Sequence, residues 1–168
     1  LLGLDSSGLH TNGYSLARKV LFERLGHDVG DRPDSLGGVS VGEALLAPHR
    51  CYLELLWPLI EGQKVSALGH ITGGGLVDNL PRVLGGCDAV IDRSTWEVPA
   101  LFQLLCDAGA VPEEESYQAF NMGIGIVLVV DAEDVESVTG DLQGLGESVH
   151  RIGDVRAPES DKGQVHWA

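Results

Sequence analysis

The chain has 168 residues, with 25 acidic and 11 basic side chains, so its formal charge at neutral pH is −14. This length predicts one ordinary domain, taken as residues 1–168, which buries roughly 70% of its unfolded surface. The acidic balance is the opposite of the basic face that nucleic-acid recognition needs, and no stretch approaches 18 consecutive apolar residues. We therefore expect neither a nucleic-acid partner nor a membrane span.

The three cysteines, Cys51, Cys87 and Cys106, are odd in number and form no CxxC pair. They predict neither a disulfide framework nor a zinc site, and with no secretory pattern at Leu1 the sequence favours the cytoplasm. Glycine accounts for 23 of the 168 residues, about twice its usual share of about 7%. This excess indicates turns and stretches of backbone that another group approaches closely.

Hydrophobic periodicity and turn residues predict interleaved strands and helices. In chain order these are a strand at residues 1–4, helices at 12–25, 41–47 and 49–59, a strand at 65–71, a helix at 76–84, a strand at 89–91, helices at 99–108 and 113–120, a strand at 123–130, a helix at 132–145, and strands at 148–155 and 164–167. Pro81 is expected to kink or end its helix. The pattern predicts an α+β fold in which helices cover a mixed β-sheet.

Two polar, glycine-containing segments each run directly into a predicted helix. We call residues 6–13 (SSGLHTNG) the first loop and residues 70–75 (HITGGG) the second loop. Free backbone N–H groups at a helix start carry partial positive charge, and glycine lets a ligand approach them, so both loops are candidate phosphate sites. The candidate substrate- or phosphate-binding residues are Ser6, Ser7, His10, Thr11, Asn12, Gly13, Thr72, Gly73, Gly74, Gly75, Asn79 and Arg82.

The placement of charge supports an anion site in the first part of the chain. Fourteen of the 25 acidic residues but only three of the 11 basic residues follow Trp96. An anionic small molecule is therefore repelled less by the part that holds both loops. A solvated acidic surface in the second part explains the same distribution without a ligand.

His70 is the candidate catalytic residue, because an imidazole with a pKa near 6.5 can move a proton near neutral pH. Structural roles remain open for each candidate. The hydroxyl and amide residues of the loops also serve as helix N-caps, and a triple glycine also makes a tight turn. His70 could bond to backbone, and Arg82 could face solvent.

Several known motifs are missing from the sequence. It has no Walker A pattern, and Gly123-Ile124-Gly125 is no dinucleotide fingerprint because Leu128 replaces the third glycine. There is also no convincing Ser-His-Asp triad, zincin motif or EF-hand loop, so we expect no metal ligands in this chain.

Four segments together resemble the carboxy-terminal half of the phosphoribosylformylglycinamidine cyclo-ligase (AIR synthetase) family. They are residues 3–21 (GLDSSGLHTNGYSLARKVL), 45–56 (LLAPHRCYLELL), 70–84 (HITGGGLVDNLPRVL) and 117–128 (YQAFNMGIGIVL), in family order. One departure is His49, which stands where the family usually has Thr. The resemblance implies the family's carboxy-terminal fold and the ATP-dependent closure of formylglycinamidine ribonucleotide to 5-aminoimidazole ribonucleotide in purine biosynthesis.

The resemblance also implies that ATP and Mg²⁺ bind mainly to an amino-terminal ATP-binding domain, which this chain lacks. It further implies a homodimer in the full-length enzyme, and an isolated chain that is inactive alone. Two other classes remain open. One is a domain of a related ATP-dependent enzyme, of the selenophosphate synthetase or thiamine-monophosphate kinase type, and the other is a non-catalytic binding or interface domain.

Overall fold

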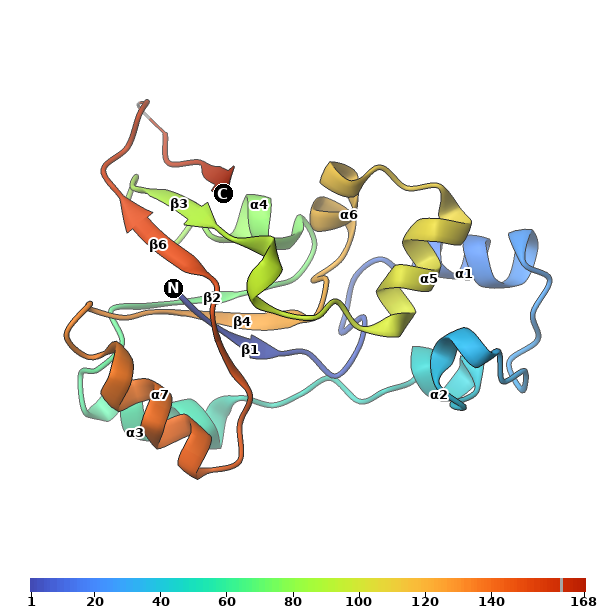
Figure 1. Ribbon diagram of the computed structural model, residues 1–168, viewed down its shortest axis with the longest axis horizontal. Helices are drawn as coiled ribbons and strands as arrows, with labels where there is room; N and C mark the ends of the chain where they lie inside the picture. Colours follow the sequence, from blue (N-terminus) through green and yellow to red (C-terminus); the bar gives the residue numbers. More distant parts are fainter. Residues whose placement is uncertain (161) are drawn as a thin grey trace.

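A computed structural model describes residues 1–160 and 162–168 (Figure 1). Its central sheet has the strand order β2-β4-β1-β5, and every neighbouring pair is antiparallel. The strands are β1 (Leu2–Asp5), β2 (Ala67–His70), β4 (Ile124–Val129) and β5 (Val149–Arg151). The buried run of β4 is the longest apolar strand of the sequence, and it lies between β2 and β1 as a strand covered on both faces should.

Helices α3 (Leu53–Glu61) and α7 (Val135–Gly144) cover one face of this sheet, below it in Figure 1. Their inward side chains, among them Leu56 and Leu142, pack with Leu2, Leu4 and Leu128 of the strands. Leu2 and Leu4 point to the same face because side chains alternate along a strand.

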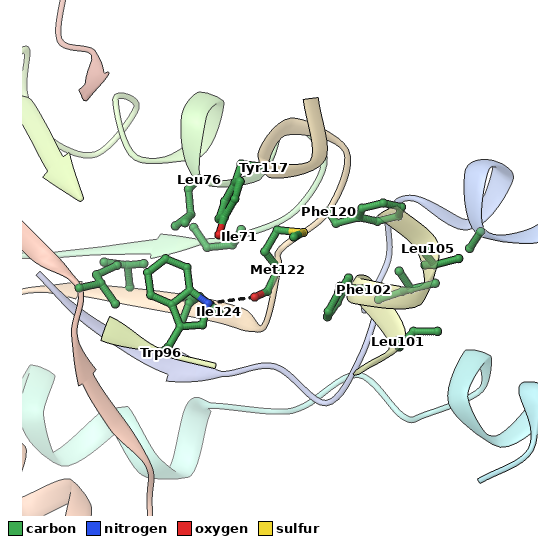
Figure 2. Packing of buried hydrophobic residues seen from close by; sticks show 14 of the residues in the cluster. Ile71, Leu76, Trp96, Leu101, Phe102, Leu105, Tyr117, Phe120, Met122 and Ile124 are labelled. Atoms are coloured by element: carbon green, nitrogen blue, oxygen red, sulfur yellow. Dashed lines mark hydrogen bonds between the residues drawn. The ribbon is translucent and has the colours of Figure 1, made fainter. Parts of the chain in front are cut away.

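A larger apolar cluster fills the opposite face (Figure 2). It receives side chains from α4 (Gly75–Asn79), α5 (Ala100–Gly109), α6 (Glu113–Ala119), α1 (Tyr14–Arg18) and α2 (Val41–Leu45). Phe102 and Phe120 pack with ring centroids 5.8 Å apart, and the indole N–H of Trp96 donates to the Met122 carbonyl at 3.0 Å. This cluster supports the backbone on which both loops rest.

A second sheet has the order β6-β3-β7, in which β3 (Asp88–Ile91) pairs antiparallel with β6 (Gly153–Arg156) and parallel with β7 (Val165–Trp167). The predicted strand at 148–155 is therefore two strands, β5 and β6, in different sheets. Between them the fully buried Ile152 donates its N–H to Leu1 and accepts from the N–H of Asp92. The α+β class is confirmed, with the strands divided between an antiparallel and a mixed sheet.

Two predicted helices have different bounds or geometry in the structure. The helix at 12–25 begins at Tyr14 and changes at residue 19 into a π-helix, η1 (Lys19–Arg24). The helix at 76–84 ends as α4 at Asn79, two residues before Pro81, because proline has no N–H to donate to the preceding turn of the helix.

The helix predicted at 49–59 is wrong over its first four residues, because α3 begins at Leu53. The segment before it has no regular secondary structure, and its Arg50 and Tyr52 side chains donate to the Asp5 carbonyl at 3.3 and 2.7 Å. These tertiary contacts override the helical pattern, and they hold His49 beside the first loop.

Two short 3-10 helices, η2 (Asp34–Leu36) and η3 (Arg93–Thr95), complete the elements given for the described residues. None of the helices in residues 1–160 and 162–168 combines the length and apolar character needed to span a bilayer.

Candidate functional site

The first loop connects β1 to α1, and the buried amide of Asn121 holds it in place. The Ser6 hydroxyl donates to Asn121 Oδ1 at 2.9 Å, and Asn121 Nδ2 donates to the Gly8 carbonyl at 2.8 Å. Asn121 Oδ1 also accepts the N–H of Gly123 at 2.9 Å. In this structure the Ser6 hydroxyl is thus engaged within the protein.

The remaining residues of the first loop divide between internal and exposed positions. Asn12 donates to the Ala119 carbonyl at 2.9 Å, and Gly13 has φ +78° with Phe120 so close that a Cβ would lie 2.5 Å from its ring. Ser7 and Thr11 are exposed, and the Ser7 hydroxyl donates to the Pro48 carbonyl at 2.6 Å. Thr11 is therefore the hydroxyl best placed to meet a ligand from solvent.

The second loop connects β2 to α4 and is held from within by Asn79. Its buried amide nitrogen lies 2.7 Å from the Gly75 carbonyl, 3.2 Å from that of Gly73 and 3.4 Å from that of Thr72. Asn79 Oδ1 accepts from the Thr72 hydroxyl and from Arg82, each at 3.3 Å. Asn79 thus fixes the turn and joins Arg82 to it.

The three glycines of the second loop have different environments. Gly75 has φ +57°, and a Cβ there would lie 1.8 Å from the Tyr117 carbonyl. Gly74 has φ +94°, and its Cβ would lie 2.5 Å from the Asp78 side chain. Gly73 is exposed with nothing within 4 Å of such a Cβ. The fold therefore requires glycine at residues 74 and 75, whereas the backbone of Gly73 is open to solvent.

His49 joins the two loops. Its Nε2 lies 3.1 Å from Nε2 of His70, at the end of β2, and its ring stacks on that of His10 with centroids 4.0 Å apart. Sequence reasoning noted His49 only as a departure from the family. No spacing rule could have revealed this contact, because it depends on tertiary contacts of residues 48–52.

Gly125 lies beneath this histidine group. A Cβ at this position would lie 2.0 Å from the Tyr52 hydroxyl and 2.6 Å from Cε1 of His10. The glycine in the middle of a buried strand was the available signal, because glycine in a strand interior often marks a close approach of another group. The chain thus needs Gly125 so that His10 and Tyr52 can reach the sheet.

The surroundings of His10 and His70 favour their uncharged rings. Burial, followed by the positive charges of His49, His70 and Arg50, lowers the pKa of His10 to about 4. Burial and then His49 also lower the pKa of His70. Arg50 itself pairs with Glu147, which offsets its charge. Near neutral pH, the His10 and His70 imidazoles are therefore available as hydrogen-bonding and proton-accepting groups.

A cavity of about 280 Å³ adjoins the first loop, between Ser6–Gly8, α2 and α5. Most of its lining is apolar, including Val39, Ala47 and Phe102. It suits an apolar group better than a phosphate.

One group of side chains has the spacing of ligands to a shared ion. Among residues 1–160 and 162–168, the group of three or more side chains that could share an ion is His10, His49 and His70. Magnesium prefers oxygen ligands in octahedral geometry, so these imidazoles do not fit it.

The fold and the two loops identify the class of domain. Residues 1–166 match the family described as AIR synthase related protein, C-terminal domain, and the chain belongs to this family. The resemblance carried by the four sequence segments is thus confirmed.

Similar curated proteins carry one common name. The phosphoribosylformylglycinamidine cyclo-ligases of Citrifermentans bemidjiense and Syntrophotalea carbinolica are 47% identical over 163 residues and 46% identical over 165 residues. The matches cover 96% and 98% of this chain but 47% of each relative. The chain therefore spans about half the length of the curated relatives it matches.

Solved structures with the same fold have lower sequence identity. Thiamine-monophosphate kinase from Stenotrophomonas maltophilia gives a TM-score of 0.61 at 17% identity, covering 99% of this chain and 50% of that one. HypE from E. coli, a hydrogenase maturation protein, gives a TM-score of 0.58 at 21% identity, and the match covers 99% of this chain and 46% of HypE. At these identities the likeness shows the fold alone.

Proposed function

We propose that this chain is the substrate-side half of a phosphoribosylformylglycinamidine cyclo-ligase, which closes formylglycinamidine ribonucleotide to 5-aminoimidazole ribonucleotide in purine biosynthesis. The observation that carries the proposal is the identity of 45–47% with cyclo-ligases over nearly the whole chain. The partner is then an amino-terminal ATP-binding domain, in a homodimeric and cytoplasmic enzyme.

In this proposal ATP activates the formyl oxygen as a phosphate ester, with Mg²⁺ held by residues of the other half. Phosphate is a far better leaving group than an amide oxygen, so an amidine nitrogen can displace it and close the ring. The work of this chain is binding, orientation and proton transfer.

The two loops would hold the ribonucleotide. Exposed backbone at Gly73 and the exposed hydroxyl of Thr11 offer donors without a cationic side chain, and Arg82 adds a charge next to the second loop. Ser7, Gly74 and Thr72 belong to the same surface in this proposal. Ser6, Asn12, Gly13, Gly75 and Asn79 act by holding the loops in shape.

His70 would accept the proton that the attacking amidine nitrogen loses on ring closure. The supporting observations are its exposed position at the end of β2 and its lowered pKa, which leaves a free lone pair near neutral pH. His10 and His49 would orient it through stacking and the 3.1 Å contact.

The proposal is tested with a fusion in which the first half of the Citrifermentans bemidjiense cyclo-ligase precedes Leu1. The fusion should form 5-aminoimidazole ribonucleotide from its precursor in the presence of ATP and Mg²⁺. A folded fusion that binds ATP without closing the ring would contradict the cyclo-ligase assignment. Phosphoryl transfer to thiamine monophosphate instead would support the kinase alternative.

Gly73→Val in this fusion tests the second loop. Valine adds bulk to open space without a collision or a positive φ, so the fold should survive while KM rises by about tenfold or more. Gly30→Val is the matched control, since Gly30 is also exposed with nothing within 4 Å. Equal KM and kcat in the two variants would remove the second loop from the binding site.

A further inference from the structure

The group formed by His10, His49 and His70 contains only nitrogen donors. One ring nitrogen from each residue can be chosen so that all three lie within 4.8 Å of one another. Two of them, Nε2 of His49 and Nε2 of His70, are 3.1 Å apart. On a tetrahedral zinc ion, two imidazole nitrogens at 2.0–2.1 Å from the metal lie roughly 3.3 Å apart. One pair thus already has nearly the separation of two ligands of one ion.

His10 supplies the third ring from the buried side. It is 5% exposed, its Nε2 accepts the N–H of Ser7 at 3.1 Å, and its Nδ1 is buried without a hydrogen-bond partner. Because Nε2 accepts a hydrogen bond, Nδ1 carries the proton of the uncharged ring in this tautomer and is a donor without an acceptor. Nδ1 can bind an ion once its proton moves to Nε2, so the bond from Ser7 and an ion are alternative partners of this ring.

The surroundings do not oppose a cation. The guanidinium of Arg50 is the nearby positive charge, and it is paired with the carboxylate of Glu147. Asp5, the last residue of β1, accepts a hydrogen bond from His150 at 2.8 Å. Metal binding requires uncharged imidazoles, and the buried position of His10 keeps that ring uncharged near neutral pH.

We infer that His10, His49 and His70 bind one divalent transition-metal ion that favours imidazole ligands, for which Zn²⁺ is the probe. Three histidines suit zinc, cobalt, nickel or copper and do not suit magnesium. The site goes beyond the proposed function, because it is defined by metal binding and not by ring closure. While the ion is bound, His70 has no free lone pair, so metal binding and the proton transfer proposed above are alternative states of this imidazole.

Closing on the ion needs only side-chain movement. His49 and His70 are exposed, so their rings can turn toward a common centre, whereas His10 stays fixed by its burial. A metal-bound imidazole keeps its proton on the other nitrogen, so whichever nitrogen of His10 binds, the ring gives up the bond from the Ser7 N–H. The exposed side remains for water or an anionic ligand in the fourth position.

The test is a titration of the chelator-treated 168-residue chain with ZnCl₂ near neutral pH, followed by calorimetry. We expect one saturable site per chain, and the visible bands of tetrahedral cobalt when Co²⁺ replaces zinc. The Ser7 amide resonance should shift on zinc addition, which binding at a distant surface histidine would not cause. Absence of a saturable site would overturn the inference.

Two matched substitutions locate the ion. His49→Gln keeps a hydrogen-bonding side chain at an exposed position while removing the imidazole, and it should weaken zinc binding by at least about tenfold. His27→Gln, outside the group, should leave zinc binding unchanged. Equal zinc affinity in His49→Gln and the unsubstituted chain would also overturn the inference. None of these readouts uses ring closure, so the two proposals fail separately.

Discussion

The two loops hold similar backbone shapes by different means. In the first loop the side chains of Ser6 and Asn12 bond to residues 115 and 107 positions away, and the bond from the Ser7 N–H to His10 is local. In the second loop they come from Asn79, four to seven residues away. The side-chain bonds that shape the second loop thus lie within its own turn, whereas those of the first reach the segment that leads into β4. The second loop also contacts distant segments, through the bond from Ile71 to Gly125 and the approach of Gly75 to Tyr117.

The strongest test of this comparison is Gly75→Ala. A Cβ at Gly75 would meet the Tyr117 carbonyl at 1.8 Å and would adopt a positive φ, so we expect a loss of more than about 4 kcal/mol of stability. Gly73→Ala, two residues earlier, should change stability by no more than about 0.5 kcal/mol. Urea unfolding measures both. Similar midpoints for the two variants would mean that the loop relaxes freely around residue 75.

Removing the long-range anchor of the first loop should have a smaller effect. Asn121→Ala deletes three hydrogen bonds of a fully buried side chain, which should lower the unfolding free energy by about 3 kcal/mol. Asn12→Ala deletes one bond and should cost about 1 kcal/mol. Amide exchange should rise in residues 6–13 of the Asn121 variant while that of the second loop stays unchanged. Equal exchange in both loops would contradict their independence.

The smallest expected effect concerns pH and the helix that adjoins the first loop. The Ser40 backbone N–H, then the Ser40 hydroxyl and Arg32, lower the pKa of Glu43 in α2 to about 2 from its usual 4.5. A lowered carboxyl pKa means that the folded state binds fewer protons, so this stabilisation is complete above pH 4.5 and is lost as pH falls toward 2.

Glu43→Gln should remove this pH dependence, which chemical shifts of the Ser40 amide between pH 5 and pH 2 would reveal. Protonation of Glu43 in α2 should leave the second loop unaffected. An unchanged Ser40 titration in the variant would assign the pH dependence to another group.

The sequence predicted most elements because their causes are local. Helix α5 follows a proline, β4 is a continuous apolar run, and Pro81 ends α4. Both glycine segments were correctly predicted to lie between a strand and a helix. Their role in binding remains a prediction.

The rest depends on contacts between distant segments. His49 reaches His70 from a segment outside regular secondary structure, which Arg50 and Tyr52 anchor to the Asp5 carbonyl. The role of Asn121 likewise needs three backbone segments to meet around one side chain. Periodicity carries no information on such meetings, so sequence reasoning did not bring the three histidines together.

The passage from β5 into β6 has a consequence for how the molecule opens. The chain passes from the first sheet to the second at Ile152, whose backbone hydrogen-bonds to Leu1 on one side and to Asp92 on the other. A shift of this segment by one residue would change the pairing register of β5 with β1 and of β6 with β3 at the same time. We therefore expect the slowly exchanging amides of β1 and β3 to become labelled together, as one cooperative unit, in native-state hydrogen exchange.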